Sequence, residues 1–352
     1  MPGIHQVLAG AAGRDAITNH ALAAQRVIRD AGFASEIFVD DAHIGPEMAE
    51  RVRAHYSWDS LAQPSDLAIL HYSIDSPAFD YALDRAAKTA VHYHNVTPAE
   101  LLWRDLPALA AQCRDGRSRL ANLTRRVVRS AADSVFNAHE MQAIGLPAAD
   151  VVGILRPQLD RPASERTTGH RRPRILFVGR GVPNKCQHEL IMAIAAMADA
   201  GVDAELRLVG SWGGSRAYFE RCKRTARILG VTDLVVILDS LSDADLAREY
   251  RDADVFLCLS DHEGYCVPLL EAMAADLPIV AYAAGAVPET LGQAGLLLDA
   301  KLPSLVAEAV AAVLGGALAD EMQGGRDRQL AHHSREATTS RLRTFVEEFA
   351  AC

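Results

Sequence analysis

Lysine, aromatic residues and long apolar runs are all scarce in this 352-residue sequence. No apolar run approaches the ~20 residues that a helix needs to cross a bilayer, so we expect no membrane-spanning helix. The formal net charge is -9, which argues against a nucleic-acid coat or a strongly membrane-adhering surface. A lysine is not the background choice here, since only four of the 36 basic residues are lysine: Lys88, Lys185, Lys223 and Lys301.

Paired cysteines and a basic leader are also missing. The six cysteines stand at positions 113, 186, 222, 258, 266 and 352, without a Cys-x-x-Cys pair. This spacing favours reduced thiols and hence a cytoplasmic protein. The N-terminus has no basic region and enters a strand-like run at once, so we expect no cleaved signal peptide.

The composition that remains is typical of a soluble globular protein, with 49% hydrophobic and 23% charged residues. The length predicts two domains. Short β-rich runs alternate with longer helical patterns, and this alternation predicts an α/β fold built from βαβ units with parallel sheets.

We expect two series of strands, with helices between them. The first series is predicted at His5–Ala9, Ser35–Val39, Leu67–His71, Ala90–His94 and Ser134–Asn137. The second is predicted at Arg174–Val178, Glu205–Val209, Leu234–Leu238, Val255–Leu259, Ile279–Tyr282 and Leu296–Leu298. Apolar periodicity predicts helices over Ile17–Ala31, near Met141 and over Thr338–Ala350.

The stretch from Leu155 to Arg174 lacks apolar periodicity, is rich in proline and charge, and is typical of a linker. It divides the chain into an N-terminal Rossmann-like domain, residues 1–160, and a C-terminal one, residues 161–335. The last helix, about residues 336–352, is a candidate to pack back on the first domain. Two such αβα domains would face each other across a deep cleft at the carboxyl ends of their strands.

The most informative feature of the second half is a pair of glutamates eight residues apart, Glu263 and Glu271. A buried strand delivers Glu263 to its carboxyl end. Pro268 then opens a helix whose N-terminus offers unpaired N–H groups and partial positive charge to a phosphate. Glu271 lies about one turn into that helix and leans back toward its start, within reach of a ribose diol. A first-turn glutamate that complements the helix dipole is the alternative reading of Glu271 alone.

Two cations follow another strand of the second half. The run from Phe177 to Lys185 ends a strand at Gly179 and Arg180, and a short loop brings Lys185 to the start of a helix near His188. A diphosphate leaving group needs such charges, because negative charge builds on it as a sugar departs. Solvated surface charges are the alternative, less so for the pair than for either residue alone.

Two further strand ends give weaker signals. Gly210 and Ser211 form part of a glycine-rich turn that would let backbone approach a nucleotide. The run Leu238–Leu246 fits a strand, a turn and a capped helix, with the backbone near Leu241 placed to edge a base. Such turns are common in α/β proteins.

These motifs resemble those of the retaining glycosyltransferases of family 4, which have the GT-B fold. The likeness covers about Arg174 to Asp299 and includes a Glu-x7-Glu element, a Gly-Arg…Lys element and a Val-Gly-Ser turn. The resemblance implies that Glu271 binds the ribose, that Arg180 and Lys185 bind the diphosphate, and that Glu263 holds the donor sugar with the backbone of Gly264, Tyr265, Cys266 and Val267. Cys186 departs from the family, which usually has glycine after the lysine.

The first half resembles the family more loosely. Gly10 and Gly13 lie in a glycine turn between the first strand and first helix, which is similar to the loop that approaches the donor phosphates. Arg14 interrupts the usual order, so the choice between the two glycines stays open. His94 resembles the family's strand-end histidine near the reacting sugar. It shares a strand face with His92 and lies nearer the strand end; a hydrogen-bonded structural histidine is the alternative.

Two apparent motifs are discounted. Asp243-Ala-Asp245 lies where a helix begins, so Ser242 or Asp243 can cap it. Asp252-Ala-Asp254 precedes its strand and therefore lies at the wrong edge of the sheet for a metal–nucleotide site. No cluster shows metal-ligand spacing, and we expect no metal. The arginine-rich stretch 114–129 allows peripheral contact with an anionic inner membrane face, although a solvated helix face is the commoner reading.

We therefore predict an enzyme that transfers a hexose from an NDP-sugar (UDP- or GDP-hexose) to a hydroxyl of a sugar or glycoconjugate, with retention and without a metal or other cofactor. A disaccharide phosphorylase or synthase and an NDP-sugar 2-epimerase are alternatives of the same fold. An inactive sugar-nucleotide-binding partner of another enzyme is the alternative outside catalysis. The sequence leaves the base, the hexose, the acceptor and the oligomeric state open.

Overall fold

A computed structural model describes residues 2–13, 15–156 and 172–352. By compactness the chain divides into two units. Unit 1 comprises Met1–Thr97, Ala111–Gln158 and His333–Cys352, and unit 2 comprises Pro98–Ala110 and Leu159–His332. The predicted linker falls largely on 157–171, outside the described residues.

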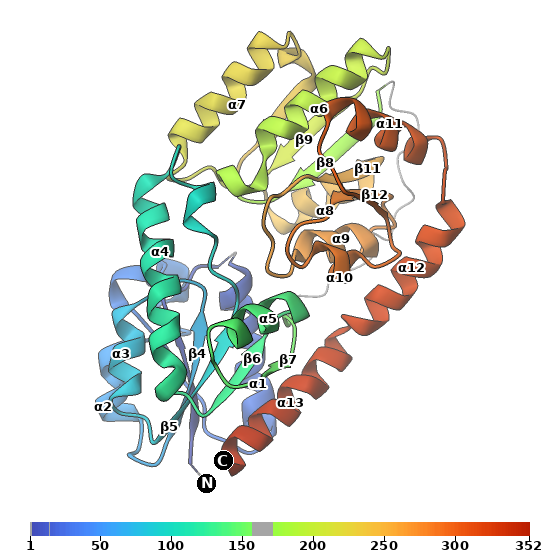
Figure 1. Ribbon diagram of the computed structural model, residues 1–352. Coiled ribbons are helices and arrows are strands. Elements are labelled where there is room, and N and C mark those ends of the chain that lie inside the picture. Colours follow the sequence, from blue (N-terminus) through green and yellow to red (C-terminus); the bar gives the residue numbers. More distant parts are fainter. Residues whose placement is uncertain (1, 14, 157–171) are drawn as a thin grey trace. The chain divides into compact units, whose positions relative to one another are not determined.

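Unit 1 is built on a parallel sheet of seven strands within the described residues, in the order β3-β2-β1-β4-β5-β6-β7 (Figure 1). Its strands are β1 (Ile4–Leu8), β2 (Ile37–Val39), β3 (Arg53–Ala54), β4 (Leu67–Tyr72), β5 (Lys88–Tyr93), β6 (Arg129–Ala132) and β7 (Ala149–Val151). Its helices are α1 (Ala16–Asp30), α2 (Trp58–Leu61), α3 (Pro77–Leu83), α5 (Val135–Ala143) and α13 (Arg335–Ala351). Helix α4 (Pro107–Asn122) runs from residues of unit 2 into those of unit 1.

Unit 2 is built on a parallel sheet of six strands within the described residues, in the order β10-β9-β8-β11-β12-β13. Its strands are β8 (Arg174–Val178), β9 (Glu205–Val209), β10 (Val235–Leu238), β11 (Val255–Cys258), β12 (Ile279–Tyr282) and β13 (Leu296–Leu298). Its helices are α6 (Gln187–Asp199), α7 (Arg216–Ile228), α8 (Asp243–Asp252), α9 (Val267–Ala274), α10 (Val287–Leu291), α11 (Pro303–Leu314) and α12 (Ala319–His332). Short 3-10 turns are η1 (Asp41–His43), η2 (Pro46–Met48), η3 (His55–Ser57), η4 (Ala99–Leu101), η5 (Leu123–Arg125), η6 (Pro183–Lys185) and η7 (Thr232–Leu234).

Both sheets have the doubly wound order of Rossmann-like folds, which confirms the predicted fold class. In each unit the chain winds outward from its first strand, returns, and continues on the other side. Strand order therefore reverses between β1 and β4 in unit 1 and between β8 and β11 in unit 2. Open α/β sheets bind ligands beyond the carboxyl ends of the strands at such a reversal.

Helix α13 completes the core of unit 1. Its apolar side chains Leu342, Phe345, Val346 and Phe349 are at most 2% exposed. They pack with residues of α1, β1, β4, β5 and β6 in one hydrophobic cluster, which includes Ile4 and Ile28. The periodicity of Thr338–Ala350 predicted this helix correctly.

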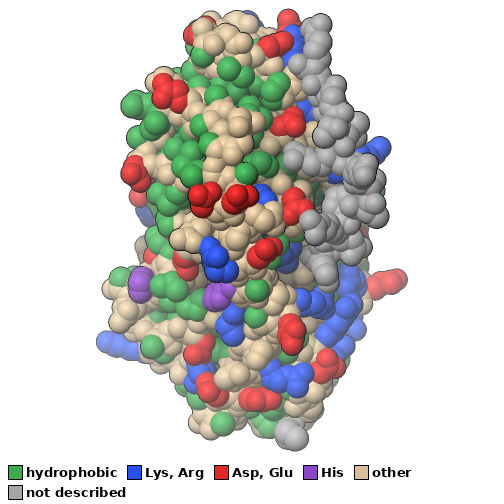
Figure 2. Space-filling model, turned by 90° about the vertical axis from the view of Figure 1, so that its right-hand side faces the viewer, with side chains coloured by type: hydrophobic (Ala, Val, Ile, Leu, Met, Phe, Trp, Pro, Cys, Tyr) green, Lys and Arg blue, Asp and Glu red, His purple; other side chains and the backbone are tan. Residues whose placement is uncertain are grey.

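Over the molecular face in Figure 2, side chains of both charge signs are interspersed.

One predicted strand is wrong. Ser134–Asn137 is not a strand: β6 ends at Ala132, and Ser134 is the N-cap of α5. The Ser134 hydroxyl accepts a hydrogen bond from the Asn137 backbone N–H, which starts the helix where the pattern had placed the strand. Strands β3, β6 and β7 were not predicted.

Candidate active site

Unit 2 brings two of the predicted site residues together at its strand-order reversal. Lys185 ends the short turn η6 after β8, and Glu263 lies in the loop after β11. The two strands are neighbours in the sheet, paired through Val255 and Phe256. The Lys185 Nζ lies 2.7 Å from both carboxylate oxygens of Glu263. The sequence assigned these residues to different parts of a donor; the structure makes them one ion pair.

The pair is shielded from water unequally. The Glu263 side chain is 7% exposed and that of Lys185 is 23% exposed. Burial alone would lower the Lys185 pKa, but the Glu263 carboxylate outweighs it and raises that pKa above its ordinary value. Lys185 is therefore charged at neutral pH, and its exposed part leaves room for a second anionic partner.

A close backbone contact holds the Glu263 loop in place. The Ala286 N–H donates a 2.8 Å hydrogen bond to the Glu263 carbonyl. Gly285 has φ +57°, and a Cβ on it would lie 2.3 Å from the same carbonyl oxygen. Only glycine suits this position, because it needs both a left-handed backbone and the missing side chain. The loop after β12 thus holds the Glu263 backbone in place. The sequence did not single this loop out, although its Gly-Ala-Val-Pro order repeats the strand–loop–proline pattern of the Glu263 loop.

The loop from Gly264 to Val267 leads into α9. Cys266 is the N-cap residue in a left-handed conformation (φ +65°), without a side-chain capping bond. The helix begins at Val267, so Pro268 lies at its second position. The sequence had predicted Pro268 at the first position. The Tyr265 carbonyl accepts a hydrogen bond from Thr290 Oγ1 at 2.7 Å. The loop is therefore anchored from α10 while the N-terminus of α9 carries partial positive charge.

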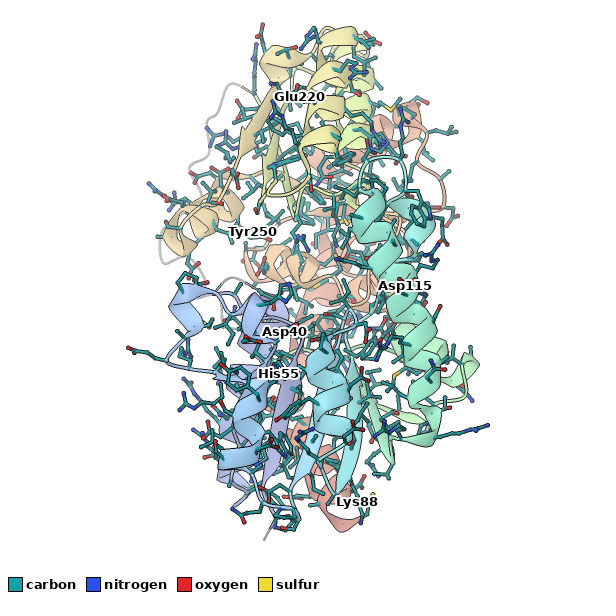
Figure 3. All side chains as sticks on the ribbon, turned by 90° about the vertical axis from the view of Figure 1, so that its left-hand side faces the viewer. Asp40, His55, Lys88, Asp115, Glu220 and Tyr250 are labelled. Carbon is teal, nitrogen blue, oxygen red and sulfur yellow. The ribbon has the colours of Figure 1, made fainter. Side chains whose placement is uncertain are left out.

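Glu271 lies in α9, as predicted, and has a partner that the sequence did not reveal. Its Oε2 accepts a hydrogen bond from the Tyr250 hydroxyl at 2.6 Å. Tyr250 belongs to α8, is 2% exposed and is labelled in Figure 3. This bond orients the carboxylate, which is half-buried in an otherwise apolar helix.

The ends of β8 and β9 lie against each other at glycines. Gly210 has φ +145°, and a Cβ on it would lie 2.1 Å from the Gly179 carbonyl oxygen. The Gly181 N–H donates to the Ser211 carbonyl at 2.8 Å. The close approach of Gly210 to the Gly179 carbonyl leaves no room for a side chain, so position 210, which the sequence singled out, requires glycine. Arg180 extends from the same turn with its side chain exposed.

Leu241 lies half-buried between β10 and α8. The preceding residue, Ser240, has a positive φ of 53°. Ser242 caps α8 by accepting a hydrogen bond from the Asp245 N–H. The sequence predicted that Ser242 or Asp243 would cap this helix. Asp254 precedes β11, and its carboxylate accepts a hydrogen bond from the Arg174 N–H at 2.8 Å.

Cys186, the departure from the family pattern, has the backbone that glycine would provide. Its φ is +54° and its side chain is fully buried. The thiol donates to Asp261 Oδ2 at 3.1 Å, and Lys301 Nζ lies 3.5 Å from the sulfur. Burial raises the pKa of the thiol. Lys301 also pairs with Asp261 and Glu189, so the loop after Lys185 is tied to three charged groups that the sequence did not single out.

Two sulfurs also border Glu263. The sulfur atoms of Cys258 and Cys266 and an oxygen of Glu263 all lie within 4.8 Å of one another. The hydrogen bond between the thiols lowers the pKa of Cys258 and raises that of Cys266. Sulfur and carboxylate donors suit a soft divalent ion, but Lys185 occupies both Glu263 oxygens at 2.7 Å.

In unit 1 the first glycine turn has an internal partner. The Gly13 N–H donates to Glu47 Oε1 at 2.7 Å. The pKa of the exposed Glu47 carboxyl is lowered most by a hydrogen bond from its own backbone N–H and next by this one from Gly13. Gly10 lies half-buried at the end of β1, and Arg14 is outside the described residues.

His94 belongs to a buried cluster of four histidines: His20, His71, His92 and His94. The rings of His92 and His94 stack with centroids 4.4 Å apart, which confirms that they share a face. Both His94 nitrogens have partners within unit 1, since Nε2 lies 2.8 Å from His71 Nδ1 and Nδ1 lies 2.9 Å from the Asp133 carboxylate. Spacing along the chain did not predict this cluster, because His20 and His71 come from α1 and β4, far in sequence from His92 and His94.

The arginine-rich stretch is largely engaged in ion pairs. Five of its arginines face carboxylates: Arg114–Asp115, Arg117–Glu140, Arg119–Asp75 and Asp80, Arg126–Asp84, and Arg129–Asp150 and Glu348. Figure 3 marks this segment by Asp115 on α4. The charge of the stretch is therefore neutralised in place to a large extent.

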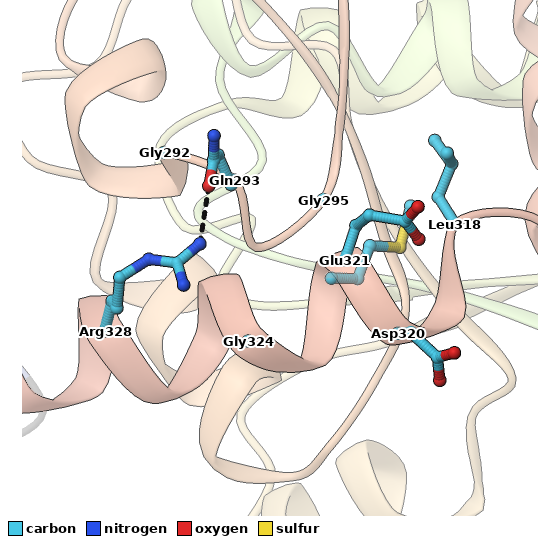
Figure 4. Close-up of a pocket in the computed structure, with 9 residues that line it drawn as sticks. Gly292, Gln293, Gly295, Leu318, Asp320, Glu321, Gly324 and Arg328 are labelled. Carbon is cyan, nitrogen blue, oxygen red and sulfur yellow. Dashed lines mark hydrogen bonds between the residues drawn. The ribbon is translucent and has the colours of Figure 1, made fainter.

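A separate hollow of about 450 Å³ lies beside α12 in unit 2 (Figure 4). Its lining is Gly292, Gln293, Gly295, Leu318, Asp320, Glu321, Met322, Gly324 and Arg328. Arg328 spans it by donating to Gln293. None of the predicted site residues lines it.

Across residues 2–13, 15–156 and 172–352, no helix is long and apolar enough to cross a membrane.

Comparison with known proteins identifies related sequences. Residues 161–325 match the family model described as "Glycosyl transferases group 1". A D-inositol 3-phosphate glycosyltransferase of Corynebacterium glutamicum (strain R) is 32% identical over 181 residues, 48% of this chain and 42% of the relative. A GDP-mannose-dependent alpha-(1-6)-phosphatidylinositol monomannoside mannosyltransferase of Mycobacterium tuberculosis (strain ATCC 25618 / H37Rv) is 34% identical over 152 residues, 41% of this chain and 38% of the relative. The matched region thus spans less than half the length of either relative.

Solved structures match the whole chain at low identity. Anabaena Alr3699/HepE in complex with UDP-glucose gives a TM-score of 0.76 at 14% identity, covering 99% of this chain and all of that one. Sucrose-phosphate synthase from Thermosynechococcus elongatus gives 0.74 at 17% identity, with the same coverage. The chain therefore has the two-domain fold of GT-B glycosyltransferases, and its residues 161–325 are similar to the group 1 glycosyltransferases.

Proposed function

We propose that this protein is a retaining, metal-independent glycosyltransferase of family 4 that moves a hexose from an NDP-sugar to an acceptor hydroxyl. One observation carries the proposal. At the strand-order reversal of unit 2, a cation and a carboxylate form a partly open pair, Lys185–Glu263. A second carboxylate, Glu271, is oriented by Tyr250 in the helix that follows. These groups match the diphosphate, hexose and ribose of one donor molecule.

In the proposal, Lys185 serves two anions. Its exposed part faces the donor diphosphate while Glu263 keeps it charged. Arg180 and the N-terminus of α9 add positive charge for the same group. Glu271 accepts hydrogen bonds from the ribose hydroxyls, and Glu263 with the Gly264–Val267 backbone holds the hexose. Positioning and stabilisation of the leaving group then account for the rate.

The proposed chemistry needs no protein base. The acceptor oxygen forms a bond to the anomeric carbon on the face from which the diphosphate oxygen departs. The acceptor proton passes to that leaving oxygen, so the charges balance. His94 is not assigned a proton transfer, because both of its ring nitrogens are engaged by His71 and Asp133. In the proposal it shapes the part of unit 1 that meets the reacting sugar.

The names of the relatives and of one structural neighbour indicate which classes of donor and acceptor to propose. One relative is named for GDP-mannose, and the Anabaena structure contains UDP-glucose. Relatives are also named for D-inositol 3-phosphate and a phosphatidylinositol mannoside. We therefore propose UDP- or GDP-hexose as the donor, bound by unit 2, and a sugar or polyol glycoconjugate as the acceptor, bound mainly by unit 1.

A ligand panel tests donor binding first. UDP, GDP, ADP and their hexose conjugates should be screened by thermal shift, because a ligand that binds only the folded state raises stability with concentration. The matching donor should then transfer its hexose to a polyol or sugar without added metal and with EDTA present. Hexose release that requires inorganic phosphate would indicate a phosphorylase. UDP release without acceptor would indicate an epimerase.

Three variants test the site. Glu271→Ala, Lys185→Ala and Arg180→Ala should each lower turnover about a hundredfold or more, as loss of a group that stabilises the transition state does. Lys223→Ala is the matched control, because Lys223 is exposed on α7 and pairs only weakly with Glu220. Near-normal turnover in all three site variants, with folding intact by circular dichroism, would refute this site assignment.

A further inference from the structure

The histidine cluster of unit 1 is fully enclosed and its hydrogen bonds follow one path. His71 Nε2 lies 2.9 Å from Gln6 Oε1, and His71 Nδ1 lies 2.8 Å from His94 Nε2. His94 Nδ1 then lies 2.9 Å from both oxygens of Asp133. The side chains of His94 and Asp133 are each 1% exposed. The path thus connects β1, β4, the end of β5 and the residue after β6.

The two ends of this path are fixed as acceptors. Gln6 donates its amide N–H to the Ala21 carbonyl at 3.0 Å, which leaves its oxygen toward His71. Asp133 offers a carboxylate, and although burial opposes ionisation, the charge of His94 and hydrogen bonds from both nearby histidines hold its pKa well below the usual range. His71 Nε2 and His94 Nδ1 must therefore each carry a proton.

The middle hydrogen bond needs a third proton. Two nitrogens 2.8 Å apart form a hydrogen bond only if one of them carries hydrogen. The four ring nitrogens of His71 and His94 then hold three protons, one more than two neutral imidazoles hold. Of the two rings, only that of His94 lies against an anion, the Asp133 carboxylate, so the extra proton is assigned to that ring. Burial lowers the pKa of His71, in agreement with a neutral His71 ring.

The other two histidines, His20 and His92, each carry their hydrogen on Nε2. The Leu155 N–H donates to His20 Nδ1 at 2.9 Å, so the neutral His20 ring carries its hydrogen on Nε2. His92 Nε2 lies 3.0 Å from Asp133 Oδ1, which leaves a lone pair on Nδ1. Burial lowers the pKa of both rings. These are the titratable groups that face the path, from α1, β4, β5 and the end of β6.

The same inventory argues against a metal in the cluster. A metal needs nitrogen lone pairs, and the hydrogen bonds of His71 and His94 use all four of their nitrogens. His20 presents an N–H to the interior. Among the described residues of the cluster, His92 Nδ1 alone keeps a lone pair for a ligand bond.

We propose that Asp133 is a positioning residue that holds the His71–His94 pair in a three-proton, singly charged state, with its ring planes fixed and no lone pair left for acid–base chemistry. This rests on the proposed function, because it explains why a histidine beside the reacting sugar takes no proton in the transfer. The charge is compensated by Asp133, so it persists in the buried interior.

Nitrogen NMR of the full chain tests the proton count without any substrate. With 15N-labelled histidine, one ring of the pair should show both nitrogens protonated throughout about pH 6 to 8.5, whereas a free histidine loses that proton near pH 6.5. Finding one proton on each ring at pH 7.5 would overturn the proposal. Absence of transfer with every donor would instead remove the proposed function and leave the proton count standing.

Two variants break the path from opposite ends. Asp133→Asn removes the anion, and Gln6→Leu removes the acceptor that keeps a proton on His71 Nε2, so in each variant the pair should lose its third proton near neutral pH. Turnover in either variant should become pH-dependent near neutrality and fall about tenfold per pH unit above the new ionisation. Asp150→Asn, which removes an exposed partner of Arg129, should keep the wild-type profile. An unchanged pH profile and an unchanged proton count in both path variants would contradict the assignment.

Discussion

Unit 1 and unit 2 each bury a carboxylate beyond the carboxyl end of a strand, but the two carboxylates are compensated by different cations. Asp133 follows β6 and is paired with the rings of His92 and His94, all about 1% exposed. Glu263 follows β11 and is paired with Lys185, which is 23% exposed. The first arrangement is closed to solvent. The second is open to a further anion, and its cation stays charged throughout the physiological range.

The difference indicates how each unit can serve the proposed reaction. A lysine that reaches solvent can exchange or share its carboxylate partner when a diphosphate arrives. A histidine locked between two acceptors cannot, so it contributes shape and fixed charge. Because burial lowers the pKa values of His20, His71 and His92, the stability of unit 1 should depend more strongly on pH than that of unit 2.

The largest expected effect is from Asp133→Asn. Removing one member of a buried charged pair typically costs about 3–5 kcal/mol, because the partner must either stay charged without compensation or give up its charge. Unit 1 should lose about that much stability in urea unfolding followed by pulse proteolysis, with mass spectrometry assigning the cleaved unit. Asp150→Asn should change it by less than about 0.5 kcal/mol. Equal effects of the two variants would contradict the closed pair in unit 1.

Acidification should separate the two units next. The pKa values of His20, His71 and His92 are lowered from 6.5 in the folded state, so their stabilisation is present above about pH 6.5 and is lost as pH falls. Each can remove about 1.4 kcal/mol per pH unit below that value. In unit 2, burial and the charge of Arg221 lower the pKa of His188 to about 4.

Between about pH 6.5 and 5.5, unit 1 should therefore lose stability faster than unit 2. The same unit-resolved urea unfolding, repeated across this range, measures both slopes. A steeper slope in unit 2 would reverse the comparison.

Gly285→Ala tests how firmly unit 2 holds its carboxylate. A Cβ would clash with the Glu263 carbonyl at 2.3 Å in a left-handed conformation, so we expect a loss of about 2–4 kcal/mol and displacement of the Glu263 loop. Gly201→Ala is the control, because Gly201 has φ +80° but no atom within 4 Å of its Cβ position. It should cost about 1 kcal/mol. Urea unfolding of both variants gives the difference, and equal losses would show that the contact with Glu263 is unimportant.

Lys185→Met is expected to have the smallest effect on stability, although a large one on transfer. Breaking a fully buried pair costs about 3–5 kcal/mol, but water reaches part of Lys185, so we expect about 2 kcal/mol in unit 2. The double variant Lys185→Met/Glu263→Gln should recover part of that loss. A double variant less stable than the sum of the single variants would contradict a simple ion pair.

Sequence patterns located most strands correctly because they are buried runs of apolar residues. Strand β8 and strand β12, for example, have the predicted bounds. The patterns failed where local hydrogen bonding decides: Ser134 looked like part of a strand and is a helix cap. Strands β3 and β7 are two and three residues long and partly exposed, so they carry no readable alternation.

For the candidate site, single loops could be predicted and partnerships could not. Glu263, Glu271 and Lys185 were identified from strand ends and helix starts. Their partners come from other elements: Tyr250 from α8 and Lys185 from the turn after β8. The histidine path joins residues 65 positions apart, from Gln6 to His71. Strand order in the folded sheet, rather than spacing along the chain, creates such pairs.

Helix α13 has a consequence for how the protein is made. Unit 1 lacks Leu342, Phe345 and Phe349 until the last helix leaves the ribosome, yet its core closes on them. Leu159–His332 of unit 2 are synthesised in the meantime, which takes about 10–35 seconds at about 5–20 residues per second. During that interval the nascent first unit presents an uncovered apolar face, while the second unit is free to fold first. The first unit in the sequence can therefore complete its core only after the second has been synthesised.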